Sequence, residues 1–250
     1  MKRPSRIGLA GSALFLWAAA SHGQLLTEVS ARTAQGWQAG AAFEKFTANY
    51  TIDTVYKNLT TPDFSWDLYS LHAARALCPR LDVFLAAALI DEARNSDHPD
   101  ISGSGGTVGA GLRGLLWEKN GLGLSAYGQL SYAEEDFSDE HLWEGSIGNH
   151  TNERSLEFME LALGLIASYT LGGFTMYAGP ETLAYEDGNY HYKTLLEDGS
   201  VYAEETLDIE QTDKASLRLG ARYQHASFWL AVSAALVHEE AEMVSAGWLF

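Results

Sequence analysis

The feature that most constrains this chain is an alternation of apolar with small or polar residues that recurs along most of its length. In residues 241–250, Val244 and Trp248 fall on one face, while Met243 and Ser245 fall on the other. A period of two is typical of a β-strand, whose successive side chains point to opposite faces. Ten segments of this kind occur at roughly 36–48, 64–77, 80–91, 106–118, 121–134, 154–169, 174–186, 214–225, 227–238 and 241–250. The sequence therefore predicts an all-β fold.

The connections between these segments alternate in length. Short ones with Gly, Asn or Pro occur near residues 78–79, 119–121, 171–173 and 225–226, as tight hairpins require. Long ones occur at 49–63, 92–105, 135–153 and 187–213. This pattern predicts an antiparallel up-and-down β-barrel of about ten strands, with short turns at one end and long loops at the other. Residues 187–213 alternate enough, with Leu207 and Ile209, to predict that the flanking strands continue there as a hairpin.

The strands are long and have aromatic residues near their ends, including Trp37, Trp117 and Trp248. Aromatic girdles of this kind and strands of about ten residues are typical of transmembrane barrels. A soluble sandwich or lipocalin-like barrel, with its apolar face inside, is the alternative. The apolar content of 46% is spread over many short segments, which favours the membrane barrel.

The amino-terminal segment has the pattern of a secretory signal peptide. Lys2, Arg3 and Arg6 precede an apolar run at 7–20, which is too short for a membrane-spanning helix. Cleavage after Ala20 or after Gly23 fits the small residues there. We expect residues 1–23 to be a signal peptide and residues 24–250 to form the barrel domain, with an uncleaved membrane anchor as the alternative.

The last segment resembles the closing strand of bacterial outer-membrane β-barrels, in which a terminal Phe is part of the signal read by the assembly machinery. The residues that carry this resemblance are Trp248 and Phe250. The resemblance implies location in the cell outer membrane, contact with outer-membrane lipid and lipopolysaccharide, and contact with the barrel assembly machinery during biogenesis. It covers the architecture and names no functional family.

Charge and cysteine content exclude several classes of function. The formal net charge of −17 makes nucleic acid an improbable partner. The single Cys78 cannot form an intramolecular disulfide. We expect no cofactor and no metal centre, because no segment fits the EF-hand spacing.

Parity within the strands places a set of charged residues on the inward face. A narrow lumen favours pairing of opposite charges, which closes the interior instead of making a selective pore. The predicted lumen ion network consists of Glu44, Asp82, Arg113, Glu160, Glu181, Arg218 and Arg222. Asp67 and Arg75 also fall in the inward set. Arg218 and Arg222 should each face a carboxylate from another strand.

Two sequence patterns resemble those of enzymes. His225, Ser227 and Glu239 resemble the His-x-Ser pair and downstream Glu of outer-membrane lipid A deacylases. A continuous strand over 227–238 would carry Glu239 to the opposite rim from His225, which argues against a triad. The strand count resembles that of omptin proteases, but none of the candidate outer-rim histidines, His98, His141, His150, His191 and His238, lies beside an Asp in a recognisable motif. No catalytic residue is predicted.

The long connections are rich in acid, notably at 134–140 and 197–205. Such loops either hold divalent cations that bridge to lipopolysaccharide or are simply solvated, and the missing EF-hand spacing favours solvation. We predict an outer-membrane barrel with a narrow charge-filled lumen, acidic surface loops and a structural or surface-binding role. A small pore is the second hypothesis, and a lipid-modifying hydrolase or protease is the third.

Overall fold

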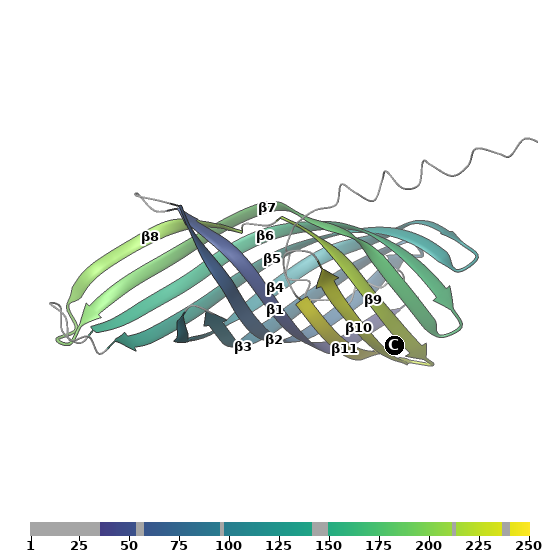
Figure 1. Ribbon diagram of the computed structural model, residues 1–250. Helices are drawn as coiled ribbons and strands as arrows, with labels where there is room; N and C mark the ends of the chain where they lie inside the picture. Colours follow the sequence, from purple (N-terminus) through teal and green to yellow (C-terminus); the bar gives the residue numbers. More distant parts are fainter. Residues whose placement is uncertain (1–35, 54–57, 96–97, 142–149, 212–213, 237–240) are drawn as a thin grey trace, which may run out of the picture.

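The computed structural model describes residues 36–53, 58–95, 98–141, 150–211, 214–236 and 241–250. Over these ranges the chain forms one antiparallel sheet that closes on itself as a barrel (Figure 1). No helix in the described ranges is long and apolar enough to cross a membrane. The signal-peptide prediction falls on residues outside these ranges.

Seven long strands form most of the wall. They are β1 (Trp37–Asp53), β2 (Asn58–Cys78), β3 (Leu81–Asn95), β4 (His98–Lys119), β5 (Leu122–His141), β6 (His150–Leu171) and β7 (Phe174–Leu196). Four shorter strands follow: β8 (Val201–Gln211), β9 (Ala215–His225), β10 (Phe228–Leu236) and β11 (Ala241–Leu249). Each strand from β1 to β7 pairs with the next along the chain, which gives the predicted up-and-down order.

Strands β8 and β9 occupy a single position in the barrel. Both pair with β7 in one continuous register, in which Gly188 lies opposite Ile209 and Thr182 lies opposite Ala215. Their other neighbours differ, because β8 pairs with β1 while β9 pairs with β10. At the level of β9, β10 and β11 the wall therefore has ten strands, namely these three and β1 to β7. At the level where β8 pairs directly with β1 it has eight, namely β8 and β1 to β7. The prediction of about ten strands is confirmed.

The barrel closes along β1 and β11. Phe46 lies opposite Ala241 at one end of this seam, and Gln38 lies opposite Leu249 at the other. Beyond that pair, the Trp37 amide donates to the main-chain oxygen of Phe250 at 3.2 Å, and the Phe250 amide donates to the Trp37 carbonyl at 2.8 Å. The first and last described strands are therefore directly joined.

The four predicted short turns lie together at one end of the barrel, which we call the turn end. They connect β2 to β3, β4 to β5, β6 to β7 and β9 to β10. Asn120 and Gly121 both have positive φ, 52° and 81°, as a two-residue hairpin turn requires. Figure 1 shows the opposite end drawn out into the β7–β8 hairpin.

The predicted long loops are wrong for most of their length. Strands continue through much of 49–63, 92–105, 135–153 and 187–213, and many acidic residues expected in loops lie on strands instead. The hairpin predicted within 187–213 is confirmed, because β7 and β8 pair from Gly188 to Leu195 around a turn at residues 197–200. We call the part of the wall that the strands form in and next to these four segments the extension.

The outer surface of the wall between the turn end and the extension is an apolar belt. Its exposed aliphatic residues include Leu71, Leu85, Leu89, Val108, Leu112, Leu130, Leu163, Leu165, Leu230 and Val232. Exposed aromatic residues gather at its two margins. Those toward the turn end are Trp37, Trp117, Tyr169, Phe174, Tyr223, Phe228 and Trp248, and those toward the extension are Phe43, Tyr69, Tyr132 and Tyr185. A belt between two aromatic girdles is the surface that a barrel presents to a bilayer.

Candidate functional site

The interior of the belt holds the seven residues predicted to form a lumen network. All seven are buried, and they come from β1, β3, β4, β6, β7 and β9. Asp67 and Arg75, which were also expected inside, face outward, and that expectation is wrong. The inward face of β2 is formed by Trp66, Leu68, Ser70, His72 and Ala74, so both residues have the opposite parity. Asp67 lies 3.9 Å from Lys45, and Arg75 lies over the ring of Trp37.

Asp82 and Arg113 form a buried ion pair between neighbouring strands. They lie directly opposite each other on β3 and β4. The Arg113 Nε and Nη2 groups donate to Asp82 Oδ2 at 3.0 and 2.9 Å. Two charge-assisted hydrogen bonds between largely buried groups fix both side chains and tie these strands together on the lumen side.

A second group is built around Glu181 on β7. Arg218 of β9 donates from Nε to Glu181 Oε2 at 3.1 Å, and the Tyr127 hydroxyl of β5 donates to the same oxygen. Tyr127 reaches Glu181 across β6 because Gly164 has no side chain, and a Cβ there would lie 2.2 Å from the Tyr127 ring. Glu44 on β1 also interacts with the Arg218 charge, and its Oε1 has no hydrogen-bond partner. Arg218 therefore faces a carboxylate of another strand, Glu181, and a second carboxylate, Glu44, lies within reach of its charge.

Arg222 has a different environment from Arg218, although both point inward from β9. Its guanidinium lies 4.7 Å from the centre of the Trp229 ring, and its Nη groups lie 3.4 and 3.5 Å from Gln38 Oε1. His72 packs against the same indole, with ring centroids 5.5 Å apart. Trp229 is fully buried and lies over Gly40 and Gly247, where a Cβ would approach its ring to 2.7 Å. This layer fills the lumen toward the turn end.

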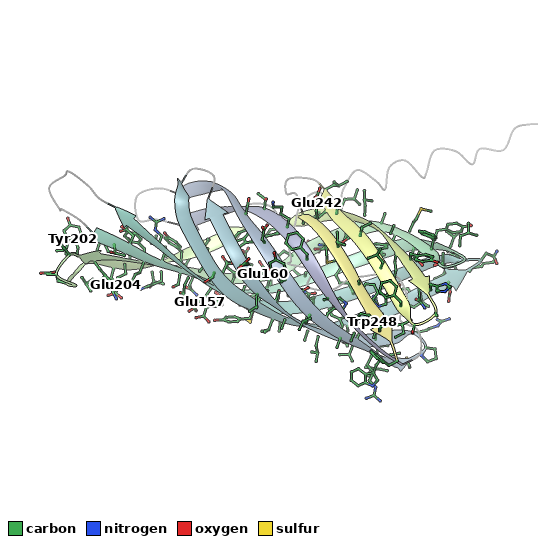
Figure 2. All side chains as sticks on the ribbon, turned by 90° about the horizontal axis from the view of Figure 1, so that it is seen from below. Glu157, Glu160, Tyr202, Glu204, Glu242 and Trp248 are labelled. Atoms are coloured by element: carbon green, nitrogen blue, oxygen red, sulfur yellow. The ribbon has the colours of Figure 1, made fainter. Side chains whose placement is uncertain are left out.

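Glu160 is the seventh predicted lumen residue and is buried on β6. It lies opposite Ser131 of β5 and Glu186 of β7. Figure 2 shows Glu160 and Glu157 midway along the barrel, between Tyr202 and Glu204 at one end and Trp248 toward the other. Lys214 reaches Glu186 at 3.9 Å, so a cation lies near this pair of carboxyl groups.

The interior where the belt meets the extension is apolar, which the sequence did not lead us to expect. Its buried cluster consists of Phe46, Trp66, Leu68, Ala86, Ala88, Ile90, Ala133, Leu156, Phe158, Ile209, Ala235 and Ala241. Tyr190 and Leu207 pack against it. Trp66, Leu156 and Ile209 are almost completely inaccessible to solvent. We call this group the apolar plug.

One carboxyl lies against the apolar plug. Glu135 on β5 is fully buried, and its Oε2 accepts a hydrogen bond from Trp66 Nε1 on β2, across the faces of β3 and β4. Its Oε1 has no hydrogen-bond partner. Burial raises the pKa of the Glu135 carboxyl to about 8, although the Trp66 hydrogen bond acts in the opposite direction. Sequence reasoning missed Glu135, because 135–153 was interpreted as a loop and the alternation through Glu134, Glu135 and Asp136 was not followed. Trp66 falls in the predicted strand at 64–77, but its face was not assigned.

The outward face of the extension is acidic. Glu134 and Glu157 lie directly opposite each other on β5 and β6. Lys193 lies 3.5 Å from Glu153 on the same face. In the described part of the chain, no group of three or more His, Cys, Asp or Glu side chains is arranged to hold a metal ion. The acidic face is therefore a charged surface and offers no cation cage among the described residues.

A hydroxyl, an imidazole and a carboxylate meet on this face, between β7 and β8. His191 Nδ1 lies 3.0 Å from Thr206 Oγ1, and its Nε2 lies 3.5 Å from Glu204 Oε1. The side chains of His191 and Glu204 are 38% and 54% exposed, so water competes for both contacts. We interpret the group as a polar link between the two strands of the hairpin.

The deacylase-like pattern is not assembled by the described residues. His225 ends β9 and stacks on Tyr223, while Ser227 lies in the following turn. Strand β10 runs without interruption from Phe228 to Leu236, away from that turn. Glu239 lies outside the described residues, as do the side chains of His98, His141, His150 and His238.

Comparison with known proteins agrees with this architecture. No protein-family model and no curated protein sequence matches the chain. The outer membrane protease OmpT from Escherichia coli is similar in structure, with a TM-score of 0.56 and 9% sequence identity over 88% of this chain and 100% of that chain. This chain has the fold of a bacterial outer-membrane β-barrel.

Two further barrels are similar with lower scores. The translocator domain of the autotransporter NalP from Neisseria meningitidis has a TM-score of 0.45 and 11% identity, over 88% of this chain and 90% of that chain. An outer membrane channel from Pseudomonas putida F1 has a TM-score of 0.44 and 11% identity, over 90% and 99%. Identities this low concern the fold alone, so no activity is transferred to this chain.

Proposed function

We propose that this protein is a closed outer-membrane barrel with a structural or surface-binding role, and that the extension is its working surface. The observation that carries this proposal is the filled interior. The apolar plug lies where the belt meets the extension, the Glu181 and Asp82 ion pairs lie within the belt, and Trp229 lies toward the turn end. Barrels of eight to ten strands are narrow enough for side chains to occupy the lumen. Because these layers would block passage through the lumen, a role of the surface is the simplest function.

Conductance across a planar bilayer tests the closed state. Wild-type protein should be nearly non-conducting. Replacing Trp66 and Trp229 together by Ala removes the two largest fully buried side chains and should open a measurable conductance. The outward-facing Trp37 and Trp248, replaced in the same way, provide the matched control and should leave conductance unchanged. A large conductance in the wild type would instead establish the small pore, which is the second candidate because charged residues line the belt interior.

A second double variant tests the charge of the lumen. Arg218→Ser with Arg222→Ser removes two buried cations, one of which, Arg218, pairs with Glu181 and lies near Glu44. The variant should be less stable and should conduct cations in preference to anions, because the remaining charge is negative. An unchanged wild-type-like conductance would mean that these residues do not contribute to closure.

A hydrolase or protease is the least supported function. The similar protease shares only the fold at 9% identity. The hydroxyl, imidazole and carboxylate at Thr206, His191 and Glu204 are open to water, which weakens any such relay. Assays of peptide and ester hydrolysis with purified protein would detect the activity directly.

We further propose an orientation in the outer membrane, with the turn end in the periplasm and the extension outside the cell. Short turns on the periplasmic side are the usual arrangement in such barrels. The exposed native Cys78 near the turn end supplies an internal probe. A membrane-impermeant maleimide should leave Cys78 unlabelled in intact cells, and should label Ser200→Cys in a Cys78→Ser background. The reverse labelling would invert the orientation.

Export requires the proposed signal peptide at residues 1–23. Amino-terminal sequencing of protein purified from membranes should find Gln24, or Ser21 if cleavage follows Ala20. Recovery of an intact amino terminus would support the membrane anchor instead. Contact with lipopolysaccharide and with the barrel assembly machinery belongs to the same proposal and follows from the outer-membrane location.

A further inference from the structure

Among the described residues, most of strand β8 has a strand neighbour on only one edge. It pairs with β7 from Val201 to Ile209, whereas its pairing with β1 is confined to Ile209, Glu210 and Gln211. Within the described residues, no strand pairs with the second edge of residues 201–208. An edge strand presents a row of unpaired N–H and C=O groups on its open side, which is a template for another strand. Figure 1 shows β8 in the hairpin with β7 at the far end of the extension.

The side chains along this edge are exposed and mainly acidic. Val201 and Tyr202 are 51% and 59% exposed, and Glu204, Glu205 and Asp208 are also exposed. Glu197 and Asp198 add two carboxylates in the adjoining turn. No Lys or Arg occurs between Lys193 and Lys214 in the sequence. Within the described part of the chain, this edge therefore combines main-chain groups without a strand partner, two exposed apolar side chains, and charged side chains of its own that are all negative.

The charge decides among the possible occupants. Antiparallel pairing of β8 with β8 of a second copy would bring Glu204 and Glu205 close to their own equivalents, and like charges opposed across strands are destabilising. Charged residues on an edge also discourage pairing with neutral strands. A strand that carries Lys or Arg is attracted instead of repelled, because its cations pair with the acidic side chains of β8 and are steered toward them.

We infer that the open edge of β8 at residues 201–208 accepts an extended, cationic polypeptide segment as an added strand. Main-chain hydrogen bonds to β8 supply the pairing, basic side chains meet Glu204, Glu205 and Asp208, and apolar side chains contact Val201 and Tyr202. This inference rests on the proposed surface-binding role and names the class of its partner.

The test uses full-length protein in detergent micelles and a short fluorescent peptide of alternating lysine and valine. Fluorescence anisotropy should show binding that weakens as salt is raised. A peptide of the same sequence with alternate amide nitrogens methylated keeps the charge but cannot complete the ladder, and its affinity should fall at least about tenfold. A peptide of alternating glutamate and valine should not bind. Equal binding of the methylated and unmethylated peptides would overturn the added-strand inference.

A matched pair of protein variants locates the site. Glu204→Gln with Glu205→Gln should weaken binding of the lysine peptide at least about tenfold. Glu153→Gln with Glu157→Gln removes as much charge from the same extension but on β6, whose two edges are paired with β5 and β7, and should change binding little. If both double variants lose affinity equally, binding is diffuse electrostatic attraction and the site is wrong.

Hydrogen exchange supplies a structural readout. Amides of residues 201–208 should exchange more slowly when the lysine peptide is bound, while those of β6 should not change. Conductance keeps this inference separate from the proposed closed barrel. A conducting barrel that binds the peptide at β8 overturns the closed state alone, and a closed barrel that does not bind it overturns this inference alone.

Discussion

The belt and the extension are built from the same strands with opposite polarity. In the belt, β6 turns Met159 outward and Glu160 inward, whereas in the extension it turns Glu157 outward and Phe158 inward. Strand β1 changes in the same way, from outward Phe43 and inward Glu44 to outward Lys45 and inward Phe46. Parity is continuous along both strands, and only the chemical character of the two faces is exchanged.

The surrounding solvent explains the exchange. A wall that faces hydrocarbon must be apolar outside, so its polar groups are confined to the lumen and must pair there. A wall that faces water on the outside can bury apolar side chains within, as soluble sheets do. The level at which the polarity changes, near Lys45, Asp67, Asp91, Glu134 and Glu157, therefore marks the membrane boundary that we expect on this side of the protein.

The largest expected effect comes from breaking the polar interior of the belt. Arg218→Ala leaves the buried carboxylates of Glu181 and Glu44 without their cation and should lower the free energy of unfolding by about 3–5 kcal/mol. Arg75→Ala, which removes an exposed guanidinium from the outside of the same belt, should cost less than about 1 kcal/mol. Urea-induced unfolding in lipid vesicles measures both. Similar losses of stability in the two variants would show that the buried ion pairs contribute no more than an exposed charge.

A cation on the outer face locates the boundary directly. Leu130→Arg places a charge on the belt and should cost about 2–4 kcal/mol in folding from urea into vesicles. Asp136→Arg, on the same face of β5 but beyond Tyr132, should change stability by no more than about 0.5 kcal/mol. Equal costs at the two positions would contradict the assignment of belt and extension.

The buried carboxyl of the extension predicts a pH dependence. Glu135 has a folded pKa of about 8, above its ordinary value of 4.5, so the folded chain retains a proton that the unfolded chain loses. Stability should therefore be full below the ordinary value and should fall as pH rises toward 8. Between pH 6 and pH 7.5 the loss is at most about 2 kcal/mol. Thermal unfolding at several pH values should show this loss in the wild type, and Glu135→Gln should remove it while keeping an acceptor for Trp66.

The smallest expected effect concerns the closing seam. Deleting Phe250 removes two main-chain hydrogen bonds to Trp37 and should lower stability by about 1 kcal/mol. The amount assembled in the outer membrane should also fall if Trp248 and Phe250 form the predicted assembly signal. Leu249→Ala, which faces inward and keeps those bonds, should matter less. Quantification of folded protein in membrane fractions by its resistance to unfolding in SDS compares the two variants, and equal assembly of both would count against the signal.

Alternation was sufficient to predict the barrel, because a strand fixes the side of each residue once the parity is known. It also brought the inward residues Asp82, Arg113 and Arg218 together in one list, although their partners depend on register, which no single strand encodes. The extension was misread as loops because its polarity is exchanged, so the belt pattern ends while the strand continues. Strand β2 shows the same difficulty, since inward His72 and inward Leu68 share one face.

Contacts between strands that are not neighbours could not be predicted from the pattern of any single strand. Tyr127 meets Glu181 only because β6 offers Gly164 between them, and Trp66 meets Glu135 across two intervening strands. On β7 the inward parity changes between Leu183 and Gly188, where the register with β6 shifts beside Ala162. Contacts of this kind follow from the closure of the sheet, which sets the distance between strands that are not neighbours.

Closure also has a consequence for the order of events when the chain folds. One edge of β1 is satisfied at once by β2, but its other edge must wait for β8 and β11, which come some 160 and 200 residues later in the sequence. Pairings so distant along the chain form late, because a long loop must close before they contribute. Until then β1 exposes a strand edge that combines aromatic and aliphatic side chains with open main-chain groups. The unfinished barrel therefore has its greatest risk of mispairing at its first strand, and that risk ends only when the last strand arrives.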